Sequence, residues 1–178
     1  MNRILASVVT LQQHARALAE NSEAYRPIAC PHCQLGGLWR HGCYHRKADR
    51  GSGVGESFNP VAVLRFLCRA CARTCSRLPA CIAPRRWYDW AVQQVVLVLL
   101  LGGSSLHHCA CCTCRDRRTV RRWREWLRGR SDRFGFLLRS RFAELGRFAD
   151  HDSFWRNVIE RLSLAQAMAW LDRDVVVP

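Results

Sequence analysis

The sequence has almost no lysine and few acidic residues. Lys47 is the only lysine among 28 basic residues, and 14 acidic residues leave a formal net charge of +14 at pH 7. A GC-rich genome explains most of the preference for arginine, so that preference says little about function. The excess of positive charge indicates a polyanionic partner, most often nucleic acid. A protein-binding or ribosome-associated module with a basic face is the alternative.

Long hydrophobic runs are also missing. The longest, Val95–Leu101, has seven residues, whereas a membrane-spanning helix needs about 20. The apolar stretch near the N-terminus is interrupted by Gln12, Gln13 and His14 and lacks a small-residue cleavage site, so we expect no secretory signal. We therefore expect a cytoplasmic protein, nucleoid-associated when bound to DNA, with no membrane partner.

The eleven cysteines are an odd number. In a chain without a secretory signal, cysteines are more often metal ligands or buried thiols than disulfide partners. Apolar residues make up 49% of the sequence, which is enough for a folded core and too much for a disordered tail.

The periodicity of apolar residues and the turn signals predict the following elements. Helices are predicted over Ile4–Ala19, Arg86–Leu101, Ser105–Cys112 and Arg117–Leu127, and two more within Phe134–Leu171, with a break near Asp150–Asp152. Short strands are predicted at Leu38–Arg40, Tyr44–Arg46 and Val61–Leu67, with a turn at His41-Gly42 and a glycine-rich loop over 50–55. We expect a frayed end at 175–178.

These elements predict an α+β fold that is mostly helical, a small zinc ribbon followed by a helical domain with a helix-turn-helix. The predicted segments are an N-terminal helix (1–26), the zinc ribbon (27–84), the helix-turn-helix region (85–130) and a C-terminal helical segment (131–178).

Two CxxC pairs, Cys30/Cys33 and Cys68/Cys71, lie 34 residues apart. Each pair can form a tight turn that presents two thiolates, and two such turns complete a tetrahedral sulfur shell for zinc. Four thiolates leave no open position for catalysis, so the sequence predicts one structural zinc ion. A small sheet with few apolar residues needs such an ion to fold. Four buried free thiols are the alternative.

Other histidines and cysteines compete as ligands. His32 lies inside the first CxxC pair and would bind only in place of a cysteine. His41, Cys43 and His45 alternate along a predicted strand, and we expect surface or packing positions for them. We expect Cys75 and Cys81 to be buried small side chains.

Residues 105–123 have the length of a helix-turn-helix. Leu106, Cys109 and Ala110 are expected to face the core from the first helix. Val120, Trp123 and Leu127 form one apolar stripe on the second helix, for which Asp116 suits the N-cap. The segment from 115 to 133 carries nine arginines against three acidic residues. An arginine-rich face opposite an apolar stripe is typical of a recognition helix, although an ordinary solvated helix is the alternative. The predicted DNA contacts are Arg115, Arg117, Arg118, Thr119, Arg121, Arg122 and Arg124.

A dense cluster of possible ligands precedes this helix: His107, His108, Cys109, Cys111, Cys112 and Cys114. A second zinc ion is one hypothesis. However, adjacent residues on a helix point in different directions, so four of these groups do not easily converge on one metal.

The order of the motifs resembles a known family. CPHCQLGGLWRHGCYHR, LRFLCRACARTCSRLPACIAPRRWY, a helix, GGSSL and RRTVRRW are similar to the zinc-ribbon and helix-turn-helix N-terminal region of bacterial insertion-sequence transposases and to short transposon-associated proteins of unknown function. The resemblance covers residues 28–128. It implies recognition of element-end DNA, with Cys30, Cys33, Cys68 and Cys71 as zinc ligands and the arginines of the second helix as DNA contacts. In the family the first helix has an Ala/Leu-rich face and the turn has a glycine, whereas here Cys109–Cys112 and Cys114 take those places.

The transposase nuclease domain has no counterpart in this sequence. Only 50 residues follow Arg128, and they are predicted to be helical. We expect the C-terminal carboxylates to be surface or capping residues rather than metal ligands of a catalytic site: Asp150, Asp152, Glu160, Asp172 and Asp174.

The expected function is therefore a non-catalytic DNA-binding protein associated with a bacterial mobile element, not an enzyme. Its expected partner is double-stranded DNA. A second copy of the chain, as a dimer, and a transposase subunit are the alternatives for a protein partner. A protein-interaction adaptor with a structural zinc is the alternative, and an unrecognised nuclease is the third hypothesis. Salt dependence separates the first two, because DNA binding by several arginines releases counterions.

Overall fold

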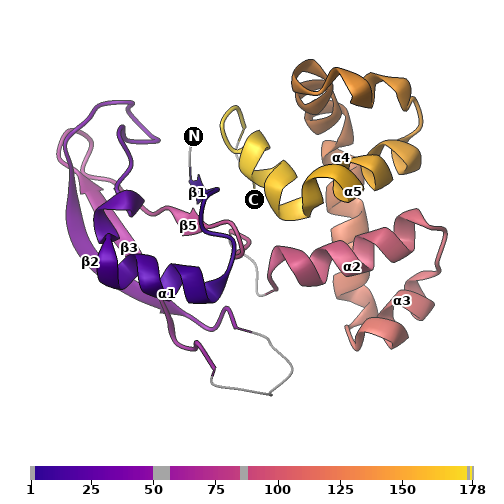
Figure 1. Cartoon of the computed structure of the whole chain (residues 1–178), viewed down its shortest axis with the longest axis horizontal. Coiled ribbons are helices and arrows are strands. Elements are labelled where there is room, and N and C mark those ends of the chain that lie inside the picture. The colour runs from indigo at the N-terminus through magenta and orange to yellow at the C-terminus, as the bar shows by residue number, and fades with distance from the viewer. Residues whose placement is uncertain (1–2, 50–56, 85–87, 176, 178) are drawn as a thin grey trace. The chain divides into compact units, whose positions relative to one another are not determined.

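The computed structural model describes residues 3–49, 57–84, 88–175 and 177 (Figure 1). The chain divides into two compact units: unit 1 spans Met1–Asp89 and Asp172–Pro178, and unit 2 spans Trp90–Leu171. Unit 1 holds the strands and unit 2 is helical, so the predicted α+β class is confirmed. No helix in the described ranges is both long enough and apolar enough to cross a membrane.

Unit 1 contains two small sheets. Strands β2 (Leu38–Arg46), β3 (Val61–Cys68) and β4 (Thr74–Cys75) form an antiparallel sheet in that order. Strands β1 (Ile4–Leu5) and β5 (Leu78–Pro79) pair in parallel. The predicted strand at Val61–Leu67 is confirmed as β3.

The prediction of a helix from Ile4 was wrong. Helix α1 spans Leu11–Glu20, because Thr10 is its N-cap and forms a capping box with Gln13. The Thr10 hydroxyl accepts a hydrogen bond from the Gln13 amide, and the Gln13 side chain accepts one from the Thr10 amide. Ile4 instead pairs with Leu78 in β1 and β5. A short 3-10 helix, η1 (Ser22–Tyr25), follows α1.

Residues 38–46 form one strand rather than the two that we predicted. The register of β2 against β3 shifts between Arg40 and Cys43, which is a β-bulge. Gly42 has φ +77°, a conformation that glycine adopts without steric cost. A bulge therefore stands where we predicted a turn, and β2 pairs with β3 on both sides of it. The glycine-rich loop expected over 50–55 lies outside the described residues.

The last residues of the chain belong to unit 1. Asp172, which we expected at the surface, is buried and accepts hydrogen bonds from the backbone amides of Arg3 and Ile4. Burial raises the pKa of this carboxyl. Val175 and Val177 are also buried, which contradicts the frayed end predicted there. The burial of Asp172 depends on hydrogen bonds to residues that are distant in the sequence.

Unit 2 consists of α-helices and one 3-10 helix. They are α2 (Trp90–Leu101), α3 (Leu106–Thr113), α4 (Arg117–Arg141), η2 (Ala143–Arg147) and α5 (His151–Leu171). Arg86, where we expected α2 to start, lies outside the described residues. The predicted stop of α2 at Gly102-Gly103 is confirmed, and Ser105 caps α3 by accepting a hydrogen bond from the His108 amide.

Helix α4 does not end before Gly129 as predicted. It continues to Arg141, so Arg130, where we expected a segment boundary, lies inside it. A glycine inside a helix costs about 1 kcal/mol relative to alanine, and burial of Phe134 and Leu138 on later turns offsets that cost. The break between the last helices spans 142–150 and contains η2.

Aromatic residues form much of the core of unit 2. Phe134 and Phe154 each pack edge-on against Trp155, with ring centroids 6.4 and 5.4 Å away. The Phe136 side chain, by contrast, is 72% exposed. In α5 the backbone leaves helical geometry at Ser163, where the Leu164 amide donates a hydrogen bond to Oε1 of Gln94 at 2.6 Å.

Candidate metal centre and basic helix

The two CxxC segments adopt the same backbone turn. The carbonyl of Cys30 accepts a hydrogen bond from the Gln34 amide, and the carbonyl of Cys68 accepts one from the Ala72 amide, both at 2.9 Å. In each segment the amide of the first cysteine donates to the carbonyl five residues later, at 2.8 and 2.9 Å. Gln34 and Ala72 also share a left-handed conformation, with φ of 62° and 53°. The loop before β2 and the loop after β3 are therefore equivalent turns.

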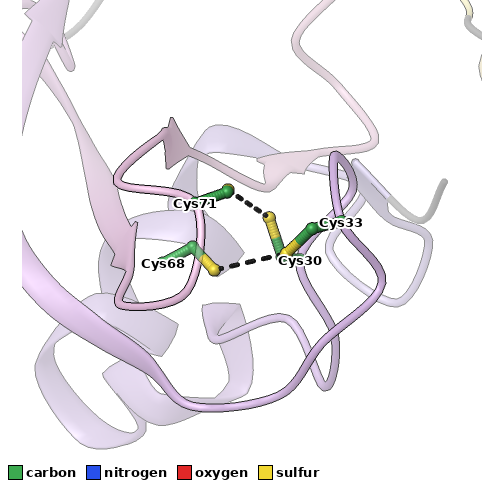
Figure 2. Close-up of side chains that lie close together, drawn as sticks. All are labelled: Cys30, Cys33, Cys68 and Cys71. Carbon is green, nitrogen blue, oxygen red and sulfur yellow. Dashed lines mark hydrogen bonds between the residues drawn. The ribbon is translucent and has the colours of Figure 1, made fainter.

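These turns bring four sulfur atoms together (Figure 2). Sγ of Cys30 lies 3.7 Å from Sγ of Cys71, and Sγ of Cys33 lies 3.6 Å from Sγ of Cys68. All four Sγ atoms lie within 4.8 Å of one another. A tetrahedron of sulfurs about 2.3 Å from a central zinc has edges of about 3.8 Å. The separations of 3.7 and 3.6 Å are close to those edges and are too long for disulfides, which measure about 2.05 Å.

The surroundings favour ionised sulfur at Cys30. Burial opposes ionisation, but the backbone amides of Cys33 and His32 and the neighbouring thiols outweigh it and lower the Cys30 pKa to about 7. At Cys33 the Leu35 amide favours the thiolate, yet burial and the other cysteines raise the pKa to about 11. The pKa of Cys71 is also raised. Cys33 and Cys71 therefore favour the neutral thiol, and a bound cation would stabilise their thiolates.

The fit of this cluster to a metal ion follows from its donors. Four sulfurs in tetrahedral reach are the ligand set of zinc and of iron–sulfur sites. Cys30 and Cys68 are fully buried in a cluster with Tyr25, Leu38 and Phe66. The predicted ligand set is thus brought together, and it can hold one metal ion.

The competing ligands lie elsewhere. His41, Cys43 and His45 are exposed on β2, and Cys75 and Cys81 are half-buried, with pKa values that burial raises to about 11. Within the described ranges, the tetracysteine cluster is the one group of three or more Cys, His, Asp or Glu residues whose ligand atoms converge.

The cysteines considered for a second metal site do not share one environment. Cys109 is buried, whereas Cys111, Cys112 and Cys114 are exposed. Sγ of Cys111 lies 3.7 Å from Nε2 of His107, and Sγ of Cys112 lies 3.4 Å from Nε2 of His108. These separate pairs do not form a common shell in this structure.

The turn between α3 and α4 spans three residues, 114–116. Cys114 has φ 51° and so adopts the left-handed conformation in which many helices end. Asp116 is the N-cap of α4 as predicted, and its Oδ1 accepts hydrogen bonds from the amides of Arg118 at 2.8 Å and Thr119 at 3.3 Å.

Helix α4 separates an apolar stripe from a basic face. The predicted stripe of Val120, Trp123 and Leu127 is buried. Of the residues predicted to contact DNA, Arg117, Arg118, Arg121 and Arg122 are exposed on the first turns of α4, whereas Arg115, Thr119 and Arg124 are half-buried. The structure thus gathers four exposed guanidinium groups within six residues at the start of this helix.

Comparisons with protein-family models, curated proteins and solved structures found no match for this chain.

Proposed function

We propose that the chain is a non-catalytic DNA-binding protein associated with a bacterial mobile element. In this proposal unit 1 is a zinc ribbon with one structural zinc ion, and α3 and α4 form a helix-turn-helix with α4 as the recognition helix. The link to a mobile element rests on the motif order that resembles insertion-sequence transposases. The protein would act in the cytoplasm, on the nucleoid.

The observation that carries the proposal is the exposed arginine cluster at the start of α4. Arg117, Arg118, Arg121 and Arg122 are exposed, while Val120 and Trp123 anchor the same turns in the core. The N-terminal residues of a recognition helix are those that reach base edges in the major groove. Arginine suits this task, because its planar fork binds phosphate and the O6 and N7 atoms of guanine.

The role of α3 in this proposal is to hold α4 against the duplex backbone. The short turn at 114–116 and the Asp116 cap define where α4 begins. Buried Cys109 on α3 and Val120 on α4 belong to the apolar side of this helix pair. In a helix-turn-helix the first helix crosses the DNA backbone while the second lies in the major groove, and α3 would have the role of the first helix.

The experiment compares two quadruple variants that remove the same charge. The test variant replaces Arg117, Arg118, Arg121 and Arg122 with alanine. The control variant replaces four other exposed arginines of unit 2: Arg128, Arg130 and Arg133 on later turns of α4, and Arg156 on α5. Binding to random duplex DNA is measured over a salt series by fluorescence anisotropy.

We expect the test variant to bind more weakly than the control. The slope of log K against log salt is negative, and each lost phosphate contact makes it less steep by about 0.9. Equal losses in both variants would mean that only net charge matters, and would contradict a recognition helix at α4. If the wild-type protein failed to bind duplex DNA at low salt, the DNA hypothesis would be lost.

The exposed apolar residues support a second candidate, a protein-interaction adaptor. Phe136, Val95 and Val98 are exposed in unit 2. An adaptor that uses such residues would bind its partner with little dependence on salt, whereas DNA binding weakens steeply as salt rises.

A further inference from the structure

One face of the antiparallel sheet in unit 1 carries an exposed tryptophan, Trp39, and a half-buried tyrosine, Tyr44, which packs in part against the core. Trp39 on β2 lies directly opposite Leu67 on β3, and Tyr44 lies opposite Val63. Opposed residues share a face, and alternate residues of β3 do so as well. Trp39, Tyr44 and Arg65 therefore lie on the same face. Leu64, Phe66 and Cys68 occupy the other face, in the core around the cysteine cluster.

Each of the two rings is paired with an arginine. Cζ of Arg69 lies 4.7 Å from the centroid of the Trp39 ring, and Cζ of Arg65 lies 5.3 Å from the centroid of the Tyr44 ring. Both arginines are exposed, and the Trp39 side chain is 56% exposed. The arginine covers only part of the Trp39 ring. The rest of the ring surface is in water and is open to a second stacked group.

Two shallow hollows flank Tyr44, with volumes of about 420 and 440 Å³. They share Arg3, Tyr44 and Ser76, and the first is also lined by Arg65 and His32. None of the residues that line either hollow is acidic. The nearby Asp172 is buried and is not among them. The hollows therefore favour an anionic ligand.

The pairing of flat rings with cations selects the class of anion. Proteins that bind single strands combine a basic groove for the phosphates with aromatic side chains on which unpaired bases stack. Bases inside a duplex are already stacked on one another and do not offer their faces. Trp39 and Tyr44 supply stacking surfaces, while Arg3, Arg65 and Arg69 supply the positive charge.

We propose that this face of the zinc ribbon, formed by Trp39, Tyr44, Arg65 and Arg69, binds single-stranded nucleic acid by stacking bases on the two rings and holding phosphates with the arginines. The site is separate from α4, so it adds a second contact to the duplex-binding function proposed above and does not depend on it. Pro31 and His32 of the first CxxC turn line the hollow beside Tyr44, so the metal cluster positions one wall of this site.

The test measures binding of fluorescein-labelled dT12 and rU12 by anisotropy, with the full-length, metal-loaded protein. To remove the contribution of α4, the same measurements are made in the Arg117/Arg118/Arg121/Arg122 quadruple alanine background. We expect Trp39→Ala to raise Kd roughly 5- to 150-fold, the measured range for loss of one stacked base. Trp39→Phe keeps a stacking ring and should stay closer to wild type.

Phe136→Ala is the matched control, because it removes another exposed aromatic side chain from the chain. It should leave dT12 and rU12 binding unchanged. Arg65→Ala should flatten the salt dependence by about 0.7 in log K per log salt, the value for one phosphate contact on a single strand. Metal content and circular dichroism verify that each variant folds.

Tight binding to either oligonucleotide that is lost in Trp39→Ala supports the site, and a preference for rU12 over dT12 would identify RNA as the ligand. Equal binding by wild type and Trp39→Ala overturns the proposal, as does complete loss of single-strand binding in the quadruple background. Polyglutamate that competes with dT12 as well as unlabelled dT12 does would also overturn it, since charge alone would then explain binding.

Discussion

Sγ of Cys30 lies 3.7 Å from Sγ of Cys71, although the two residues are 41 positions apart in the chain. The equivalent distance between Cys33 and Cys68 is 3.6 Å. Each close pair joins one CxxC turn to the other, so the cluster ties the loop before β2 to the loop after β3. Any group that occupies the cluster therefore also determines how these loops and the sheet between them fold.

Replacing Cys71 with serine should abolish metal binding and destabilise unit 1. Binding free energies of structural zinc in small domains are about 10–16 kcal/mol, which exceeds the total stability of a typical domain. We expect one zinc ion per wild-type chain by elemental analysis and none in Cys71→Ser after dialysis against a chelator. Iron in place of zinc would identify the other metal that four thiolates accept.

Cys43→Ser is the control for this experiment, because Cys43 is exposed and lies outside the cluster. It should retain the metal and the wild-type unfolding temperature. Metal loss in Cys43→Ser equal to that in Cys71→Ser would contradict the assignment of the ligands.

Phe134 and Phe136 offer a matched test of the core of unit 2. The two phenylalanines are two residues apart in α4, but Phe134 is fully buried and Phe136 is 72% exposed. The Phe134 ring packs edge-on against Trp126 and Trp155, at 6.3 and 6.4 Å between centroids. Phe134→Ala should lower the free energy of unfolding by about 3–5 kcal/mol, and Phe136→Ala by about 0.5 kcal/mol or less.

Chemical unfolding followed by circular dichroism measures both values. Similar losses for the two variants would show that α4 packs with a different face from the one described. If α4 is a recognition helix, Phe136→Ala should also leave duplex DNA binding unchanged.

Asp116→Ala should destabilise the start of α4. The Asp116 carboxylate accepts hydrogen bonds from two backbone amides that have no partner within the helix. Loss of an N-cap of this kind costs about 1 kcal/mol. Asp132→Ala is the control, because it removes the same charge from an exposed position inside the helix. A loss of stability no larger in Asp116→Ala than in Asp132→Ala would argue against the cap.

His14 should make unit 1 less stable in mild acid. It is buried, and its two ring nitrogens lie 2.5 Å from the Tyr25 hydroxyl and 2.8 Å from the Ala62 carbonyl oxygen. Because a carbonyl only accepts, Nε2 carries the proton and donates to Ala62, and Nδ1 accepts from Tyr25. Burial lowers the pKa of His14 below its ordinary value of 6.5, despite the opposing effect of Ala62.

The sign of the effect follows from this lowered pKa. As pH falls below 6.5, the unfolded chain takes up the proton before the folded protein does, so the stability present above pH 6.5 is lost. His14→Gln cannot titrate and should show a smaller loss of unfolding free energy between pH 7 and pH 5.5. Comparing both proteins at the same pH cancels any contribution from protonation of the cysteines. Identical pH dependence in the two proteins would exclude His14 as a source.

Local patterns in the sequence were enough to predict the four-cysteine cluster and the amphipathic part of α4. The CxxC spacing places two thiols on one turn whatever surrounds it, so Cys30, Cys33, Cys68 and Cys71 were identified in advance. The buried stripe of Val120, Trp123 and Leu127 follows from helical periodicity, and the Asp116 cap follows from side-chain chemistry next to that helix.

Other features depend on residues far apart in the chain, and only the tertiary structure decided them. Ile4 became a strand because Leu78 pairs with it, and Asp172 is buried because its carboxylate accepts the amides of Arg3 and Ile4. The face that joins Trp39 to Arg69 and Tyr44 to Arg65 depends on the register between β2 and β3. Sequence periodicity reports which side of an element is apolar, whereas the partner that covers that side is chosen by packing and hydrogen bonding across the whole fold.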